Sequence, residues 1–258
     1  GIRDHCVTGV QTCALPISGL CARTTLSRAI LVSMLLLVAA SLAAVPGERL
    51  EWTVRWMGIE AGTAWSTVTT NGAGVRVDAG CRSAPWLAKL YPVEDALGSE
   101  WRPNVGSSRY FTRYREGDYQ RDEDVALSGD PIVARRSQLM AEGWKTWEDR
   151  YKGVAGVEDP VSAFYRLREE AGPVGETLRW KVWSGRWPTS VQVVTAAAET
   201  WEGRPTLRVE VLAEHRTEDL EPKMTVWLSD DADRVPLAAI VHTRAGPVEV
   251  RLAARTVP

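Results

Sequence analysis

The fold class is decided by the stretch MTVWLSDDADRVPL, residues 224–237. In its first part Met224, Val226 and Leu228 alternate with Thr, Trp and Ser, and this two-residue period is typical of a strand that packs one face. An acidic turn then interrupts the strand, and β-branched and aliphatic residues resume from Val235 to Val241. We interpret the stretch as one hairpin of a larger sheet.

The same pattern continues along the chain. Alternating or β-branched runs bounded by Gly, Pro, Asn or acidic residues predict strands. The predicted strands cover residues 50–56, 63–70, 75–79, 94–102, 107–115, 118–127, 131–139, 144–151, 176–183, 190–200, 206–214, 223–229, 235–243 and 248–254. Early turns are predicted at residues 58–62 and at Asn71-Gly72. The fold class is therefore mainly β, a many-stranded antiparallel meander.

Two short helices are predicted within this meander. Residues 85–91 begin with Pro and stop before Pro92. Residues 160–170 follow Asp159, a good N-cap, and place Pro160 at the first helical position. We expect the second helix to lie on or in the sheet through one stripe of side chains, formed by Val161, Phe164, Tyr165 and Arg168.

The N-terminal region predicts export. Residues 7–17 look like a translated sequencing adapter, so residues 1–18 are interpreted as an artefact and excluded from fold reasoning. Residues 19–44 have a basic start, an apolar run and small residues at its end, as a secretory signal peptide does. The alternative is an uncleaved anchor, which needs about 20 apolar residues.

Cleavage is expected near Ala43 or Ala44. It leaves residues 45–258 as a single exported β-rich domain, periplasmic and no longer integral to the membrane.

Composition restricts the partners and the chemistry. The formal net charge is −2, so nucleic acid is not expected as a partner. After residue 44 the sequence contains a single cysteine, Cys81, and we interpret it as a small buried residue rather than a reactive nucleophile. All 12 Trp residues follow residue 50, and Trp both packs sheets and lines ligand clefts.

Several segments together resemble a family of bacterial envelope proteins, the domain-of-unknown-function family 3108. They are residues 56–62, 90–93 with Asp95, Tyr119 with 121–123, 159–163 with Tyr165, 225–231 and 234–236. The resemblance implies an exported domain with a rolled or barrel-like antiparallel sheet, similar to periplasmic lipoprotein carriers. It carries over no catalytic residue.

Catalytic and metal chemistry are poorly represented. His215 and His242 lie near no nucleophile elbow, so the sequence leans against an enzyme without excluding one. The acidic turn at 230–233 lacks the regular spacing, the Gly and the distal Glu of a calcium loop. No metal and no cofactor are expected.

A dense Arg and Tyr region is the main candidate for ligand binding. Arg109, Arg113, Arg115 and Arg121 with Tyr110, Tyr114 and Tyr119 could hold an anionic amphiphile, or they could form a charge-paired outer face with nearby carboxylates. The complete set of candidate ligand-binding residues is Trp86, Tyr91, Arg109, Tyr114, Arg121 and Trp227.

Two functional hypotheses follow. The first is a non-enzymatic periplasmic domain that binds an amphipathic or envelope-derived ligand, such as a lipid, inside a Trp-lined rolled sheet. The second is a structural or assembly factor that docks an envelope protein through free sheet edges.

Overall fold

The computed structural model describes residues 45–71, 74–102, 106–213, 224–243 and 245–258. The predicted adapter-derived segment, the signal peptide, Gly72 and His215 lie outside these described residues.

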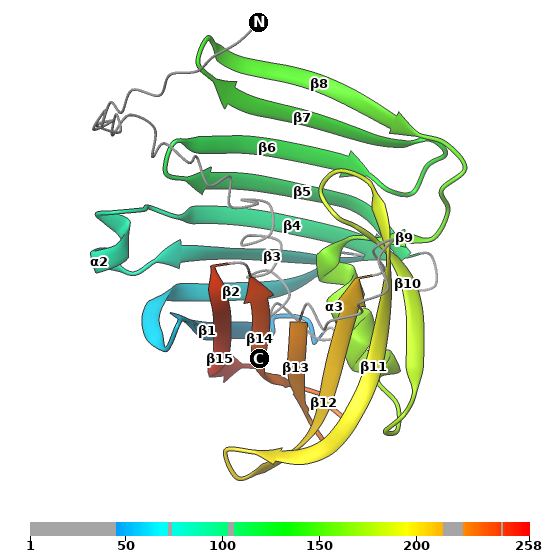
Figure 1. Cartoon of the computed structure of the whole chain (residues 1–258). Helices are drawn as coiled ribbons and strands as arrows, with labels where there is room; N and C mark the ends of the chain where they lie inside the picture. The colour runs from blue at the N-terminus through cyan, green and yellow to red at the C-terminus, as the bar shows by residue number, and fades with distance from the viewer. Residues whose placement is uncertain (1–44, 72–73, 103–105, 214–223, 244) are drawn as a thin grey trace, which may run out of the picture.

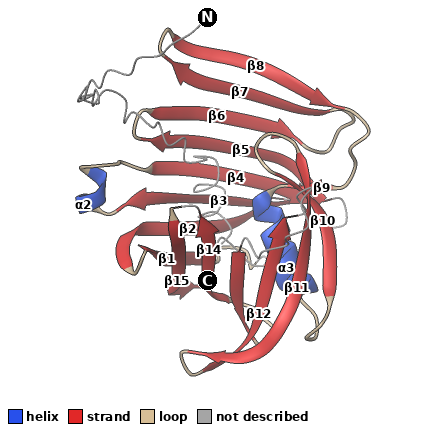
Figure 2. Ribbon diagram, viewed as in Figure 1, coloured by secondary structure: helices blue, strands red, loops and turns tan. Residues whose placement is uncertain are grey.

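The described residues form one large sheet and two helices (Figures 1 and 2). The elements are β1 (Arg49–Trp56), β2 (Ile59–Asn71), β3 (Gly74–Ser83), α2 (Pro85–Ala88), β4 (Glu94–Arg102), β5 (Gly106–Glu116), β6 (Tyr119–Ala126), β7 (Ile132–Met140), β8 (Gly143–Tyr151), β9 (Val157–Glu158), α3 (Pro160–Glu170), β10 (Thr177–Trp183), β11 (Pro188–Trp201), β12 (Arg204–Ala213), β13 (Met224–Ser229), β14 (Pro236–Thr243) and β15 (Gly246–Thr256).

The sheet has the strand order β8-β7-β6-β5-β4-β3-β2-β1-β15-β14-β13-β12-β11-β10-β9. Neighbouring strands are antiparallel except β9 and β10, which are parallel. Pairing of β1 with β15 brings the first and last described strands together in the middle of the sheet, so β8 and β9 form its edges. The sheet is curved but open, and the predicted mainly antiparallel rolled sheet is confirmed.

Two local predictions need correction. Helix α2 covers residues 85–88 rather than 85–91, because the Leu90 and Tyr91 amides both turn back to the Leu87 carbonyl before Pro92. The first turn lies at Met57-Gly58 rather than at residues 58–62. Both turn residues have positive φ, 49° and 83°, which matches the two-residue turns that fit the twist of a hairpin.

Helix α3 lies inside the curve of the sheet (Figure 2). The predicted helix at 160–170 is confirmed, as is its inward stripe, since Val161, Phe164 and Tyr165 are at most 1% exposed. The rings of Tyr165 and Trp101 lie 4.7 Å apart. The helix therefore fills the concave side and shares one hydrophobic core with the strands.

Asp159 holds the N-terminus of α3. One carboxylate oxygen accepts hydrogen bonds from the Val161 and Ser162 amides at 2.8 and 3.0 Å. The other accepts from the hydroxyls of Ser99 on β4, at 2.6 Å, and Ser107 on β5. Burial raises the pKa of this carboxyl although the hydrogen bonds oppose the shift. Asp159 thus caps the helix and attaches it to the sheet.

Arg168 holds the other end of α3. Its guanidinium donates to the Asp233 carbonyl in the β13–β14 turn and lies 3.6 Å from the Glu48 carboxylate. Glu48 is fully buried and also accepts from Arg255 on β15, at 2.7 Å. Burial lowers the pKa of Arg168 to about 10. These charges connect the helix with both ends of the described chain.

The Asp159→Ala substitution should lower the free energy of unfolding by about 2–4 kcal/mol, because it removes a helix cap and leaves two buried hydroxyls without their acceptor. Denaturant unfolding followed by circular dichroism measures the change. The control is Glu169→Ala, at an exposed position of the same helix, which should leave the midpoint nearly unchanged. Equal effects of the two substitutions would contradict the role of Asp159.

Candidate functional site

The six candidate ligand-binding residues do not gather at one place. Strand β5 separates the Arg and Tyr region into two faces, because Tyr110 and Tyr114 are buried in the core while Arg109 and Arg113 are exposed. On the outer face Arg109 makes a two-point contact with Asp124, at 3.0 and 2.6 Å. This arrangement is the charge-paired outer face, the second interpretation drawn from the sequence.

Tyr114 and Arg121 belong to an inner polar network. They lie opposite each other on β5 and β6, and Arg121 donates to the buried Glu123 carboxylate at 2.6 Å. Glu123 also accepts from the Trp183 indole, at 2.9 Å, and from Arg136. Both oxygens of the buried Glu123 carboxylate thus have donors, and the network stabilises the interior.

The same network attaches the β10–β11 turn to the far strands. Arg121 donates to the Gly185 carbonyl at 2.9 Å, and Tyr151 of β8 donates to the Arg186 carbonyl at 2.5 Å. Arg136 of β7 also donates to the Arg186 carbonyl, so the turn is bonded to β6, β7 and β8.

Trp227 lies outside the main hydrophobic cluster. Its neighbours Val226 and Leu228 point into the core, so its own ring lies on the opposite face of β13. There it is 7% exposed, packs 4.4 Å from the Trp201 ring and donates its indole N–H to Glu199 at 2.5 Å. Its role is to seal the outer face of the hairpin.

Trp86 is part of a different surface, which we call the apolar end, and Tyr91 follows it in the sequence. It consists of five apolar side chains that are 38–78% exposed. Trp56, Met57 and Ile59 come from the β1–β2 hairpin, whereas Trp86 comes from α2 and Leu90 follows that helix. Sequence reasoning selected Trp86 but missed the other four. The signal was available, since apolar residues at a hairpin turn have no core to fill.

Hydrogen bonds hold the apolar end in place. The Trp86 indole donates to the Glu60 carbonyl at 2.9 Å, so that α2 lies beside the β1–β2 hairpin. The Trp56 indole donates to the Ala245 carbonyl at 3.0 Å, and Arg55 donates to the Gly58 carbonyl through two nitrogens. Tyr91 hydrogen-bonds the Glu116 carboxylate at 3.3 Å behind this surface. The exposed rings are thus positioned in advance of any contact.

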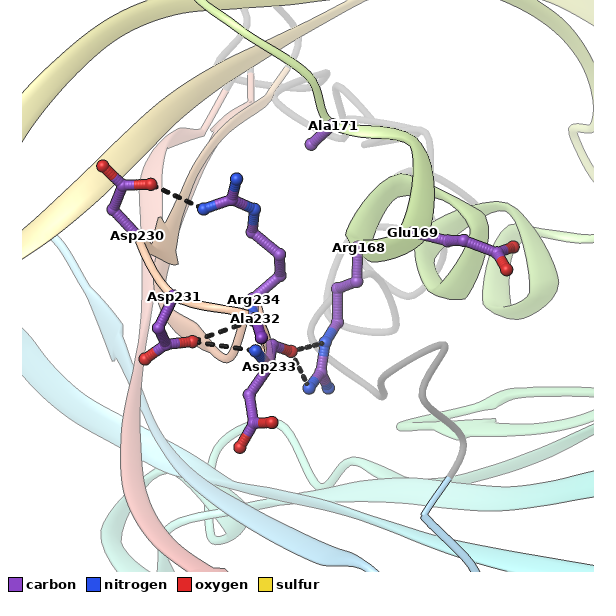
Figure 3. A pocket seen from close by; sticks show the side chains of 8 residues that line it. All are labelled: Arg168, Glu169, Ala171, Asp230, Asp231, Ala232, Asp233 and Arg234. Atoms are coloured by element: carbon purple, nitrogen blue, oxygen red, sulfur yellow. Dashed lines mark hydrogen bonds and ion pairs between the residues drawn. The ribbon is translucent and has the colours of Figure 1, made fainter.

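An open cavity of about 640 Å³ lies between the C-terminal end of α3 and the β13–β14 turn (Figure 3). Its lining residues are Arg168, Glu169, Ala171, Asp230, Asp231, Ala232, Asp233 and Arg234.

The acidic side chains of this turn are occupied locally. Asp231 accepts from the amides of Asp233 and Arg234 at 3.0 and 3.1 Å, and Asp230 pairs with Arg234 at 2.6 Å (Figure 3). These contacts form and stabilise the turn. Within the described ranges, no group of three or more His, Cys, Asp and Glu side chains is arranged to hold a metal ion.

Nucleophilic chemistry has little support at Cys81. The thiol is buried 3.8 Å from the Asp95 carboxylate, and burial raises its pKa well above the ordinary value, so the thiol stays protonated. His242 lies exposed on β14 opposite Pro247. Among the described helices, none combines the length and the apolar character needed to cross a membrane.

Residues 51–253 match the model of the family described as "Protein of unknown function (DUF3108)". The chain belongs to this family. The resemblance inferred from the sequence is thereby confirmed, and the apolar end includes two of the segments on which it rested. No curated protein matches the DUF3108 chain.

Two solved structures match this chain, and the first of them shows similarity in fold alone. A β-barrel-like protein of the family DUF1849 from Brucella abortus has a TM-score of 0.56 and 9% identity, over 83% of this chain and 98% of that one. A DUF1089 family protein from Pseudomonas aeruginosa has a TM-score of 0.38 and 9% identity, over 67% and 87% of the two chains.

Asp95 should make stability depend on pH. Burial raises its pKa from 3.8 to about 6, against the opposing hydrogen bond from the Arg115 amide. The folded state therefore keeps a proton that the unfolded state has lost, and the stability from this group is present below pH 4 and lost as the pH rises through 6.

Asp95→Asn removes this titration while keeping an acceptor for the Arg115 amide. Relative to the parent, the variant should gain up to about 3 kcal/mol between pH 4 and pH 7, measured by denaturant unfolding at both values. The control is Glu94→Gln at an exposed position, which should show no such change. A constant difference between Asp95→Asn and the parent would contradict the assignment.

Proposed function

We propose that the chain is a non-enzymatic periplasmic domain that binds an amphipathic lipid of the cell envelope, in the form of a membrane surface, through the apolar end. The observation that carries this proposal is the group of exposed apolar side chains from two separate segments, which the hydrogen bond from the Trp86 indole to the Glu60 carbonyl joins. Exposed apolar groups of this size mark interaction sites.

The packing of the interior favours recognition at the surface. Trp52 and Trp183 are at most 1% exposed, and α3 fills the concave side with its own aromatic side chains. These tryptophans pack in the core, which is one of the two roles that the sequence allows for its tryptophans. The proposal therefore places the lipid outside the rolled sheet rather than inside it.

The chemistry of the apolar end suits a lipid surface. Trp prefers the boundary between water and hydrocarbon, because its ring is apolar while its N–H stays hydrogen-bonded. A hairpin turn and the short helix α2 project from the margin of the sheet and can enter a deformable layer. Arg82 and Lys89 are exposed beside them and attract anionic headgroups, although Glu60 and Glu94 partly offset this charge.

Vesicle co-sedimentation tests the proposal. Every described element lies within residues 45–258, so this part of the chain retains the whole described sheet. It should bind vesicles of phosphatidylethanolamine and phosphatidylglycerol. A triple substitution, Trp56→Ser with Met57→Ser and Trp86→Ser, should weaken this binding at least about tenfold, because apolar burial supplies most of the affinity.

The matched control changes two exposed apolar residues elsewhere, Val174→Ser with Trp187→Ser, and should bind as the parent does. Equal binding by both variants would contradict the role of the apolar end. A different outcome would favour the second candidate, a docked protein. In that case the parent would not bind vesicles but would bind an envelope protein, and the triple substitution would abolish that binding.

A further inference from the structure

Strand β8 is a long open edge of the sheet. It contains nine residues and pairs with β7 along one side (Figure 1). The opposite edge, β9, has two residues, both buried, and lies close to β5. Of the two edges of the described sheet, β8 alone offers a row of backbone donors and acceptors to another strand.

The sequence of β8 is complementary to itself when two copies run antiparallel. If Trp147 of one copy lies opposite Trp147 of a second copy, Lys145 lies opposite Asp149 and Trp144 lies opposite Arg150. Each of these pairs occurs twice because the arrangement is symmetric. The register therefore combines two ion pairs, two cation–π pairs and a central pair of indoles.

We propose that the chain forms a homodimer in which two β8 strands pair antiparallel about a two-fold axis at Trp147. The occupant of the open edge is thus a second copy of this chain. The two sheets join into one continuous sheet, with the concave faces on the same side.

Neighbouring registers fit less well. Centring the axis on Lys145, Glu148 or Asp149 places two like charges directly opposite each other, which destabilises a strand pair. Centring it on Thr146 leaves Trp144 opposite Glu148 and pairs fewer residues of the strand. The register at Trp147 aligns the whole of β8 without opposing like charges.

The side chains that this register pairs already have contacts within the chain, but these lie at the surface: Arg150 contacts the Glu148 carboxylate at 2.7 Å, and the Arg115 guanidinium lies 5.5 Å from the Trp144 ring. Lys145 contacts Glu142 at 3.1 Å, but their side chains are 58% and 71% exposed, and such a surface pair contributes little. Asp149 contacts Arg136, and its side chain is 42% exposed. Trp147, opposite Arg136 on β7, is 38% exposed.

The symmetry also limits the assembly to two copies. Pairing about a two-fold axis is isologous, so each copy uses the same edge. Because β9 is short and buried, the joined sheet has no second open edge among its described strands through which a fibre could grow.

Molecular mass and a site-specific cross-link test the proposal. Residues 45–258, which contain Cys81 as the single cysteine, should have the mass of a dimer in analytical ultracentrifugation at micromolar concentration. Under mild oxidation Trp147→Cys should form a disulfide-linked dimer, because residues directly opposite place their Cβ atoms about 4.5–5.5 Å apart. Arg150→Cys should not, since six residues of offset separate its two copies by about 20 Å.

Charge reversal provides an independent variant on the surface of β8. Lys145→Asp places two acidic groups opposite each other and should raise the dissociation constant at least about fivefold, whereas Lys181→Asp on β10 should leave it unchanged. A monomer at all concentrations, or a dimer that cross-links through Arg150→Cys and not Trp147→Cys, would overturn the proposal. The test contains no lipid, and the triple substitution at the apolar end should preserve the dimer, so failures of the two proposals are distinguishable.

Discussion

A helix enclosed by a sheet must find partners for the polar groups at both of its ends, and the structure of this chain depends on how α3 meets that requirement. Asp159 satisfies the first amides of the helix and binds hydroxyls of β4 and β5 with the same carboxylate. At the other end, the buried guanidinium of Arg168 donates to a carbonyl of the β13–β14 hairpin. The helix is therefore joined to both halves of the sheet by polar contacts as well as by its apolar stripe.

This arrangement also fixes where recognition can occur. The buried charges of Glu48 and Arg168 lie 3.6 Å apart and offset each other inside the fold. With α3 and the core tryptophans occupying the concave side, the contact features proposed for the described part of the chain are the projecting turns and the open edge. The apolar end and β8 lie at different strands of the sheet, so the proposed lipid contact and the proposed dimer can exist together.

Local patterns predicted much of the fold. The strands, the cap at Asp159 and the inward stripe of α3 depend on residues close in sequence, and these predictions agree with the structure. The alternation of side chains along a strand also predicts that the Arg and Tyr side chains of β5 lie on different faces. Arg109 and Tyr110 are consecutive residues, so they must face opposite sides of the sheet. The candidate region was instead treated as one patch.

Other features could not be predicted from local pattern. The pairing of β1 with β15 joins residues about 200 positions apart, and the apolar end forms only when α2 meets the β1–β2 hairpin. The burial of Trp227 on the outer face likewise depends on Trp201 and Glu199 from another strand. Such contacts follow from the tertiary fold, which periodicity does not specify.

The central claim is that recognition takes place on the outside of a filled, rolled sheet. Hydrogen–deuterium exchange of residues 45–258, with and without vesicles of phosphatidylethanolamine and phosphatidylglycerol, tests it most directly. If the lipid binds at the apolar end, the amides of residues 55–62 and 84–91 should gain protection, whereas exchange in α3 and β4–β6 should stay unchanged. Protection or opening of α3 and β4–β6, with no change at the apolar end, would show that the lipid enters the interior and would contradict the claim.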